Sequence, residues 1–323
     1  MSENVSKKWL ENRGEIPVKF SASLISRKSC RIRHIGGQKM EKVECILDNL
    51  VLYTEEVPLG AFSLLEKRVM FAQLKGLLPK EIRMTIGKGA SEYHYRLNIG
   101  KGAGAITVSY KHNSAKSVDD KYTMRLEFNP QKNNDIHVEF FKIYNSLFSR
   151  HTRTVKQFDV AFDVPLNINS IFAYSFTGRD KSYFKNTLYF GCSGKHGRLK
   201  IYDKKKELEE QQGVVKAVEH LTRIEYTVKL SDALTVQVLS KLDLQLNEEY
   251  KITCVDVEKL SGETKACMLA VQSGEMQLKE FTRATKKKIQ QALESMVQLD
   301  LDHAYKSARN KIIKEITSLF SIA

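Results

Sequence analysis

Short segments that alternate apolar and polar residues, separated by glycine turns, constrain the fold of this chain more than any other feature. Three of them follow one another at Ile82–Ile86, Glu92–Ile99 and Ala105–Tyr110, and two copies of Gly-Lys-Gly-Ala, beginning at Gly87 and Gly100, separate them. A period of two is typical of half-buried strands, and such turns close hairpins. The pattern predicts an antiparallel β-meander.

Strand-like and helical segments continue on both sides of this meander. The further strands expected are Val18–Arg33, Cys45–Thr54, Tyr122–Phe128, Thr154–Val164, a hairpin across Thr187–Tyr202, and Arg223–Leu230. The helices expected are Leu59–Leu78, Ile136–Ser149, a short one at Ile168–Tyr174, and 278–296 and 301–319 near the C-terminus. The sequence therefore predicts an α+β fold: a mixed, largely antiparallel β-sheet body with flanking helices and an all-helical C-terminal tail.

A chain of 323 residues corresponds to about two structural units at roughly 150 residues each. We expect a flexible N-terminus at 1–15, a β-rich lobe at 16–130, a second lobe at 131–230 that carries the chemistry, and a helical region at 231–323 for dimerisation or DNA binding. The runs Arg125-Leu126-Glu127-Phe128 and Arg223-Ile224-Glu225-Tyr226 are similar. Duplication of one lobe would explain this echo, and so would chance.

The charge balance concerns partners rather than fold. Lys and Arg number 52 against 38 Asp and Glu, which leaves a formal charge of +14. Nucleic acid is the commonest polyanion that such a chain meets. No apolar stretch approaches the ~18 residues of a membrane span, and the polar segment Met1–Gly14 lacks the apolar core of a signal peptide. We expect a cytoplasmic protein without a membrane partner.

The segment Phe158–Asp163 is unusual because two carboxylates, Asp159 and Asp163, share one face of an apolar strand. Acids are depleted in strands. One explanation is a solvated face or ion pairs with Arg223. The other is a divalent-metal site completed by Glu225, with Glu127 as a further candidate from the internal echo. The two aspartates are roughly 13 Å apart along a straight strand, so only one can join Glu225, and the strand register decides which.

A basic hairpin follows this strand. Thr187–Lys206 contains a glycine-rich turn and then a strand that alternates basic and apolar residues, so one face can follow a phosphate backbone. The expected phosphate contacts are Lys195, His196, Arg198, Lys200, Arg223 and, in the tail, Lys286 and Lys287. For the lysines of the tail, a solvated helix face is the alternative.

The run TLYFGCSGKHGRLKIYDKKKE, preceded by FDVAFD and followed by RIEYTVK, resembles the replication initiation factor (Rep_trans) family, over roughly Arg125 to Lys229. That family comprises rolling-circle plasmid initiators of Gram-positive bacteria and relaxases of related conjugative elements. The resemblance implies a metal-dependent DNA nicking-closing enzyme. In such an enzyme a tyrosine attacks one strand of the origin, stays linked to its 5′ end and frees a 3′-OH primer.

The resemblance also implies roles for particular residues. Tyr189 matches the tyrosine of the family's YxG motif, with Tyr202 and Tyr183 as reserves, and carboxylates hold Mg²⁺ or Mn²⁺. The implied partners are double-stranded origin DNA and its nicked single strand, a second copy of the chain and a host helicase. The alternative is an initiator on the same scaffold that binds the origin without cutting it. Both alternatives predict salt-sensitive DNA binding, and only the first predicts a covalent adduct.

Overall fold

The computed structural model describes residues 43–86, 95–112, 122–132, 134–213, 218–254, 260–273, 275–276, 280–294 and 297–321. The expected flexible N-terminus at 1–15 and the expected strand Val18–Arg33 lie outside these residues.

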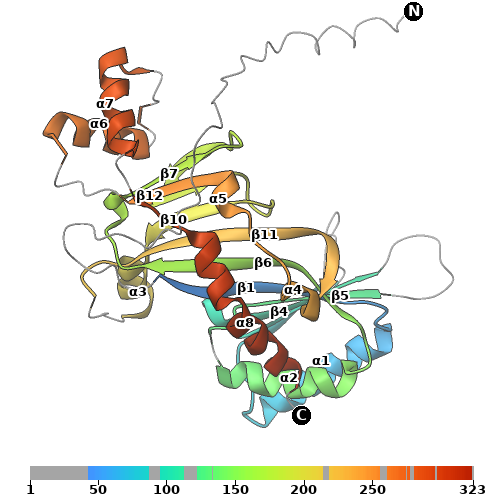
Figure 1. The fold of residues 1–323 in the computed structure, drawn as a ribbon. Helices are drawn as coiled ribbons and strands as arrows, with labels where there is room; N and C mark the ends of the chain where they lie inside the picture. The colour runs from blue at the N-terminus through green and yellow to red at the C-terminus, as the bar shows by residue number, and fades with distance from the viewer. Residues whose placement is uncertain are drawn as a thin grey trace, which may run out of the picture. The chain divides into compact units, whose positions relative to one another are not determined.

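One ten-stranded antiparallel sheet forms the body, in the order β2-β3-β4-β5-β1-β6-β11-β10-β9-β8 (Figure 1). Its strands are β1 (Glu44–Thr54), β2 (Ile82–Ile86), β3 (Tyr95–Ile99), β4 (Ile106–His112), β5 (Tyr122–Phe128), β6 (Arg153–Val164), β8 (Lys181–Phe184), β9 (Thr187–Phe190), β10 (Leu199–Asp203) and β11 (Thr222–Thr235). The predicted meander is confirmed, because β2 to β5 are sequential neighbours. The mixed α+β architecture is confirmed with it.

Strand β1 joins the two lobes that the sequence suggested. It pairs with β5 on one side and with β6 on the other, so residues on both sides of position 130 contribute to one continuous sheet. The two similar runs occupy corresponding places, since β5 and β11 flank the central pair β1 and β6.

One face of the sheet is apolar and covered by helices. Phe158, Val160 and Phe162 of β6 are buried and lie opposite Val228, Tyr226 and Ile224 of β11. The covering helices are α1 (Leu59–Leu74), α2 (Asn134–Phe148) and α8 (Leu301–Phe320). Fully burying one such side chain contributes about 1.5–3 kcal/mol, so the packing of the helices on this face stabilises the sheet.

The opposite face, here called the polar face, carries the alternate residues of the same strands. Residues directly opposite each other in an antiparallel pair share a face. The polar face therefore gathers Asp159 and Asp163 of β6, Arg223, Glu225 and Thr227 of β11, Lys200 and Tyr202 of β10, and Tyr189 of β9.

Two predictions about secondary structure are wrong in detail. The expected helix Ile168–Tyr174 is a 3₁₀ turn, η2 (Ile168–Ser170), followed by strand β7 (Ile171–Ser175). The expected all-helical tail also contributes β12 (Tyr250–Cys254) and β13 (Val297–Gln298), which form a second sheet in the order β13-β12-β7. Short apolar runs have too few residues for periodicity to separate strand from helix.

The remaining helices are α3 (Lys204–Gln212), α4 (Val236–Leu239), α5 (Leu246–Glu249), α6 (Gly262–Ser273) and α7 (Arg283–Glu294). Helix α7 packs with α6 against β7, through the buried side chains of Phe172, Met268 and Ile289. None of the helices in the described ranges has both the length and the apolar character needed to cross a bilayer.

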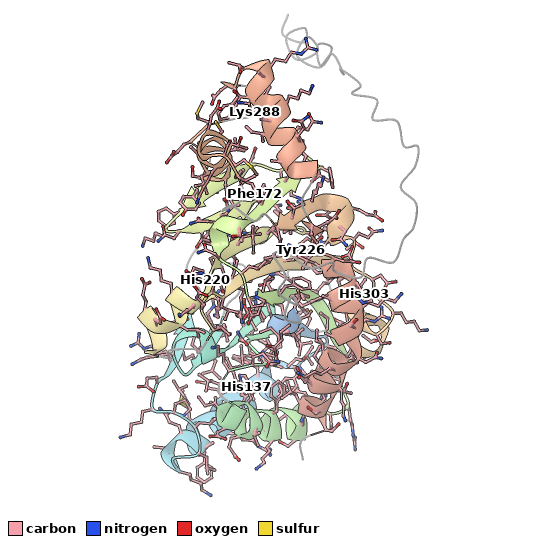
Figure 2. The ribbon with its side chains drawn as sticks, turned by 60° about the vertical axis from the view of Figure 1, so that its left-hand side comes forward. His137, Phe172, His220, Tyr226, Lys288 and His303 are labelled. Carbon is pink, nitrogen blue, oxygen red and sulfur yellow. The ribbon has the colours of Figure 1, made fainter. Side chains whose placement is uncertain are left out.

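His137 of α2 makes folding stability depend on acidity. His137, labelled in Figure 2, is 1% exposed, and neither ring nitrogen has a hydrogen-bond partner among the described residues. The rings of His137 and Phe128 meet edge to face. Burial lowers the pKa of His137 from 6.5 to about 4. A depressed folded-state pKa gives stability that is complete above pH 6.5 and lost as the pH falls towards 4.

We expect this histidine to contribute about 3 kcal/mol to the fall in unfolding free energy between pH 7 and pH 4. Urea titrations across this range check it. The variant His137→Leu removes the titrating group and should flatten the profile by that amount. An equally steep profile in His137→Leu would show that other groups cause the acid sensitivity.

Candidate functional site

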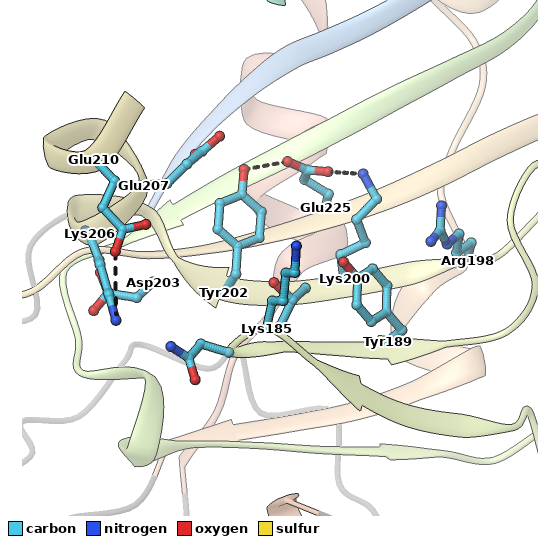
Figure 3. A pocket seen from close by; sticks show the side chains of 12 residues that line it. Lys185, Tyr189, Arg198, Lys200, Tyr202, Asp203, Lys206, Glu207, Glu210 and Glu225 are labelled. Atoms are coloured by element: carbon cyan, nitrogen blue, oxygen red, sulfur yellow. Dashed lines mark hydrogen bonds and ion pairs between the residues drawn. The ribbon is translucent and has the colours of Figure 1, made fainter. Parts of the chain in front are cut away.

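A pocket of about 760 Å³ opens on the polar face, where β9, β10 and β11 meet α3 (Figure 3). Its lining residues are Lys185, Asn186, Thr187, Tyr189, Arg198, Lys200, Tyr202, Asp203, Lys206, Glu207, Glu210 and Glu225. Alternation along β9 and β10 places Tyr189, Lys200 and Tyr202 on this side, while Leu188 and Ile201 point into the core. The pocket thus combines tyrosines, basic groups and a buried carboxylate.

Glu225 is the buried acid of this pocket, with a side chain only 7% exposed. It accepts hydrogen bonds from Lys200 Nζ at 2.5 Å and from the Tyr202 hydroxyl at 2.5 Å. Burial raises the pKa of Glu225, but the Lys200 charge and these hydrogen bonds outweigh burial and hold it below the ordinary value. Glu225 is therefore ionised and its charge is partly neutralised by Lys200.

The three candidate tyrosines differ in what their hydroxyls meet. The Tyr202 hydroxyl donates to Glu225, and burial together with this carboxylate raises the pKa of Tyr202 far above its ordinary value. Tyr183 pairs with Leu188, so it lies on the other face of the sheet, and its hydroxyl donates to Asn186.

Tyr189 differs from both. Its ring packs against the Arg198 guanidinium at 5.1 Å, and no side chain or backbone group in the described ranges makes a hydrogen bond to its hydroxyl. Of the three tyrosines, Tyr189 alone presents an unengaged hydroxyl to the pocket. That arrangement suits a nucleophile better than a phenol bound to a carboxylate.

The observed strand register shows which residue of β6 lies opposite Glu225. Thr227 lies opposite Asp159, Glu225 opposite Ala161, and Arg223 opposite Asp163. Neither aspartate is the direct neighbour of Glu225, so the expectation of a direct pair is wrong. Each aspartate is instead a diagonal neighbour, at about 7–8 Å between Cα atoms.

Asp163 forms the ion pair that was the alternative to metal binding. Arg223 donates from Nε at 2.6 Å and from Nη2 at 2.8 Å to its two carboxylate oxygens, and from Nη1 to Asp48 at 3.0 Å. Arg223 is 5% exposed; burial lowers its pKa, but the hydrogen bonds to Asp163 and the negative charges of Asp163 and Asp48 outweigh burial and raise it. Both residues are committed to this buried network in the structure. A metal contact of Asp163 or a phosphate contact of Arg223 would require breaking it.

Asp48 is a site residue that the sequence reasoning missed. It lies at the register shift between Leu47 and Asn49, where a bulge in β1 redirects the chain. Burial first, and then the charge of Glu225, raise the pKa of Asp48 despite Arg223. The available signal was an acid inside an otherwise apolar strand, the same signal that singled out Asp159.

Asp159 is the least satisfied acid on the polar face. Burial first, and then the charges of Glu225 and Asp48, raise the pKa of Asp159 to about 6 against a hydrogen bond from Thr227 and the charge of Lys200. Its Oδ1 atom is buried without a hydrogen-bond partner in the described part of the chain. Asp48, Asp159 and Glu225 thus form a set of mutually repelling hard oxygen donors, the kind that Mg²⁺ and Mn²⁺ prefer.

The geometry of these acids is not that of a closed metal site. Among the residues described, no three His, Cys, Asp or Glu side chains converge on one point as they stand. Glu127 is bound by Arg125 at 2.7 Å and by Asn49 at 3.3 Å. It lies two strands from β6, about 10 Å away, which separates it from Asp159 and Glu225.

The candidate DNA contacts divide into two groups. Arg198 and Lys200 line the pocket, and Lys195 is exposed in the turn before them. His196 is already engaged: its Nε2 faces Glu249 at 3.3 Å and its Nδ1 accepts from the Lys229 N–H.

The remaining two candidates, Lys286 and Lys287, lie on α7, whose neighbours are α6 and the second sheet. Figure 2 labels Lys288 on this helix. Lys286 and Lys287 are not among the residues that line the pocket. A DNA contact there would be separate from the contacts of Arg198 and Lys200.

Gly197 holds the end of the basic turn in place. It has a φ of +72°, its N–H bonds to Thr227 O, and its carbonyl accepts from the Tyr250 hydroxyl. A Cβ here would collide with the Arg179 guanidinium and with the Glu249 carboxylate that binds it.

We expect Gly197→Ala to lower the unfolding free energy by about 2–4 kcal/mol. Gly194→Ala is a matched control, because Gly194 has a similar φ of +69° and open space around it. It should lose only the ~1–2 kcal/mol of a strained backbone. Denaturant titration measures both. Equal losses of unfolding free energy in the two variants would show that the collision with Arg179 and Glu249 does not destabilise the fold.

Comparison with known proteins finds a family model that matches the part of the chain around the pocket. Residues 168–246, which include the pocket strands β9, β10 and β11, match the phage family model Phage_CRI, described as the N-terminal part of a replication-associated protein. This segment is therefore similar to a replication-associated protein, in line with the resemblance to replication initiators drawn from the sequence.

A solved rolling circle replication initiator protein from Geobacillus stearothermophilus aligns with a TM-score of 0.36 and 13% identity, over 84% of this chain and 97% of that chain. No curated protein matches the sequence significantly.

Proposed function

We propose that this chain is a rolling-circle replication initiator that binds its origin and nicks one DNA strand with Tyr189. The observation that carries the proposal is the Tyr189 hydroxyl, which has no hydrogen-bond partner among the described residues and lies in a pocket with Arg198 and Lys200. The pocket lies within the segment that matches the replication-associated family.

In the proposed step, the Tyr189 oxygen attacks a phosphorus atom of the DNA backbone. A bond forms between this oxygen and phosphorus, and the bond from phosphorus to the 3′ oxygen of the neighbouring nucleotide breaks. The phenolic proton leaves Tyr189, and the departing 3′ oxygen gains a proton to become a 3′-OH primer. Negative charge develops on the phosphate oxygens, and Arg198 and Lys200 are placed to stabilise it.

The linkage that results conserves the energy of the broken diester. Attack of a 3′-OH on the phosphotyrosine reverses the step, so strands can be rejoined without ATP. The partners implied by the sequence resemblance, a second copy of the chain and a host helicase, remain part of the proposal.

The acids of the polar face supply the donor chemistry for a divalent cation, although in the described residues they do not converge on one point and Asp48 is paired with Arg223. Asp48, Asp159 and Glu225 would hold it, because they supply hard oxygens, repel one another and include a buried oxygen without a partner. Bound there, Mg²⁺ or Mn²⁺ would supply Lewis-acid chemistry to a phosphate oxygen. Lys200 neutralises Glu225 in the structure, so a cation held by Glu225 would have to displace this pair.

Nicking of a supercoiled plasmid that carries the replicon encoding this chain tests the proposal. With Mg²⁺ or Mn²⁺ we expect open circles and a protein-linked DNA band on a denaturing gel. Excess EDTA should abolish both, and restored Mg²⁺ should recover them. Salt-sensitive binding to the same plasmid without any adduct would favour the non-nicking initiator instead.

A further inference from the structure

The hairpin between β8 and β9 has a strained tip beside the pocket. Its two turn residues, Lys185 and Asn186, have φ values of +46° and +59°. Asn tolerates this region of backbone space and Lys does so at a cost, so glycine would be the unstrained choice at position 185. A lysine at such a strained turn position indicates that its side chain has a function.

The Lys185 side chain lines the pocket. Figure 3 shows its ammonium group directed between Tyr202 and Lys200. The same ammonium group lies 5.4 Å from the centre of the Phe184 ring. The tip therefore presents one cation and one aromatic ring together.

Phe184 lies on the polar face. It is opposite Thr187, which is opposite Tyr202, so all three side chains share this face. Ser182 is the direct neighbour of Tyr189, which makes Phe184 a diagonal neighbour of Tyr189 at about 7–8 Å between Cα atoms. The ring is 61% exposed, and it meets no other aromatic ring in the described ranges.

A single exposed phenylalanine is common on protein surfaces, so the place of Phe184 beside the pocket and its neighbouring cation carry the argument, not its exposure. A nucleotide base suits this ring, because aromatic side chains and bases stack face to face and a neighbouring cation binds the phosphate. Only an unpaired base offers a free face, since the bases of a duplex are stacked on one another. The positive charge of Lys185 and the continuity with the pocket favour nucleic acid over an apolar protein partner.

We propose that Phe184 and Lys185 form a clamp for one unpaired nucleotide of single-stranded DNA, next to the phosphate held at Tyr189. Phe184 stacks on the base and Lys185 contacts the adjoining phosphate. The clamp rests on the proposed function, because it would hold the DNA strand that is to be cut. Phe184 is then a positioning residue.

Fluorescence anisotropy with a labelled (dT)₁₂ oligonucleotide tests the clamp on the full-length chain. We expect Phe184→Ala to weaken binding about 5-fold or more, and Phe184→Trp to retain it. The loss should disappear on a 12-mer with abasic sites, which keeps the phosphates and removes the bases. Lys185→Ala should reduce the slope of log affinity against log salt by about 0.7.

Tyr183→Ala is the matched control, because Tyr183 is an exposed aromatic of the same strand on the opposite face. It should bind (dT)₁₂ within 2-fold of the parent, a threshold of about 0.4 kcal/mol. Equal binding by Phe184→Ala and the parent would overturn the clamp, and so would an equal loss on the abasic 12-mer. Plasmid nicking separates the two proposals: normal adducts with no effect of Phe184→Ala refute the clamp alone, while base-dependent binding without adducts refutes nicking alone.

Discussion

The variant Tyr189→Phe is expected to form no covalent protein–DNA adduct and to lose at least about 10³-fold in nicking rate, because it lacks the attacking oxygen. The substitution keeps the ring that packs against Arg198, so the fold and DNA binding should persist. A denaturing gel of the plasmid reaction detects the adduct, and anisotropy checks the binding.

Two matched variants test whether the loss is specific to the Tyr189 hydroxyl. Tyr183→Phe removes a hydroxyl from the opposite face of the sheet and should nick as the parent does. Tyr202→Phe removes a hydrogen bond to Glu225, so it should nick more slowly and still form the adduct. An adduct that persists in Tyr189→Phe and vanishes in Tyr202→Phe would move the nucleophile to Tyr202.

Replacing Arg223 by alanine is expected to cost about 3–5 kcal/mol of unfolding free energy. The change leaves two carboxylates, Asp163 and Asp48, without their shared cation at a site where Arg223 is 5% exposed. Urea titration at pH 7 measures the loss.

Lys142→Ala is the control for this variant. Lys142 pairs with Glu139 at 2.9 Å on an exposed face of α2, where such pairs contribute only about 0–1 kcal/mol. A loss of less than about 1 kcal/mol in Arg223→Ala would show that Arg223 is not the residue that neutralises these acids. Arg223 would then be available for the DNA contact that the sequence suggested.

Much of the sheet could be predicted from the sequence, because alternation and glycine turns are local signals. The meander, the acidic strand and the basic hairpin all occur where those signals placed them. Strand β7 was mistaken for a helix because Ile171–Ser175 is too short to show a period, and its pairing with distant β12 decides the outcome.

The sequence could indicate most of the residues of the candidate site, but not which of them lie next to one another. Register is a long-range property, so nothing local could show that Ala161 and not an aspartate faces Glu225. Asp48 was missed for the same reason. Its position near the other acids depends on the bulge in β1 and on the pairing of β1 with β6. Tyr189 and Tyr202 were distinguishable by motif, and the hydrogen bond from Tyr202 to Glu225 supplies a physical reason for preferring Tyr189.

Peptide mapping of the trapped adduct tests the central claim most directly. An origin oligonucleotide with a sulfur in place of the bridging 3′ oxygen traps the covalent product, because the released thiol rejoins poorly. Digestion and mass spectrometry should then find the nucleotide on Tyr189. Attachment to Tyr202, to Tyr183 or to no residue would contradict the account.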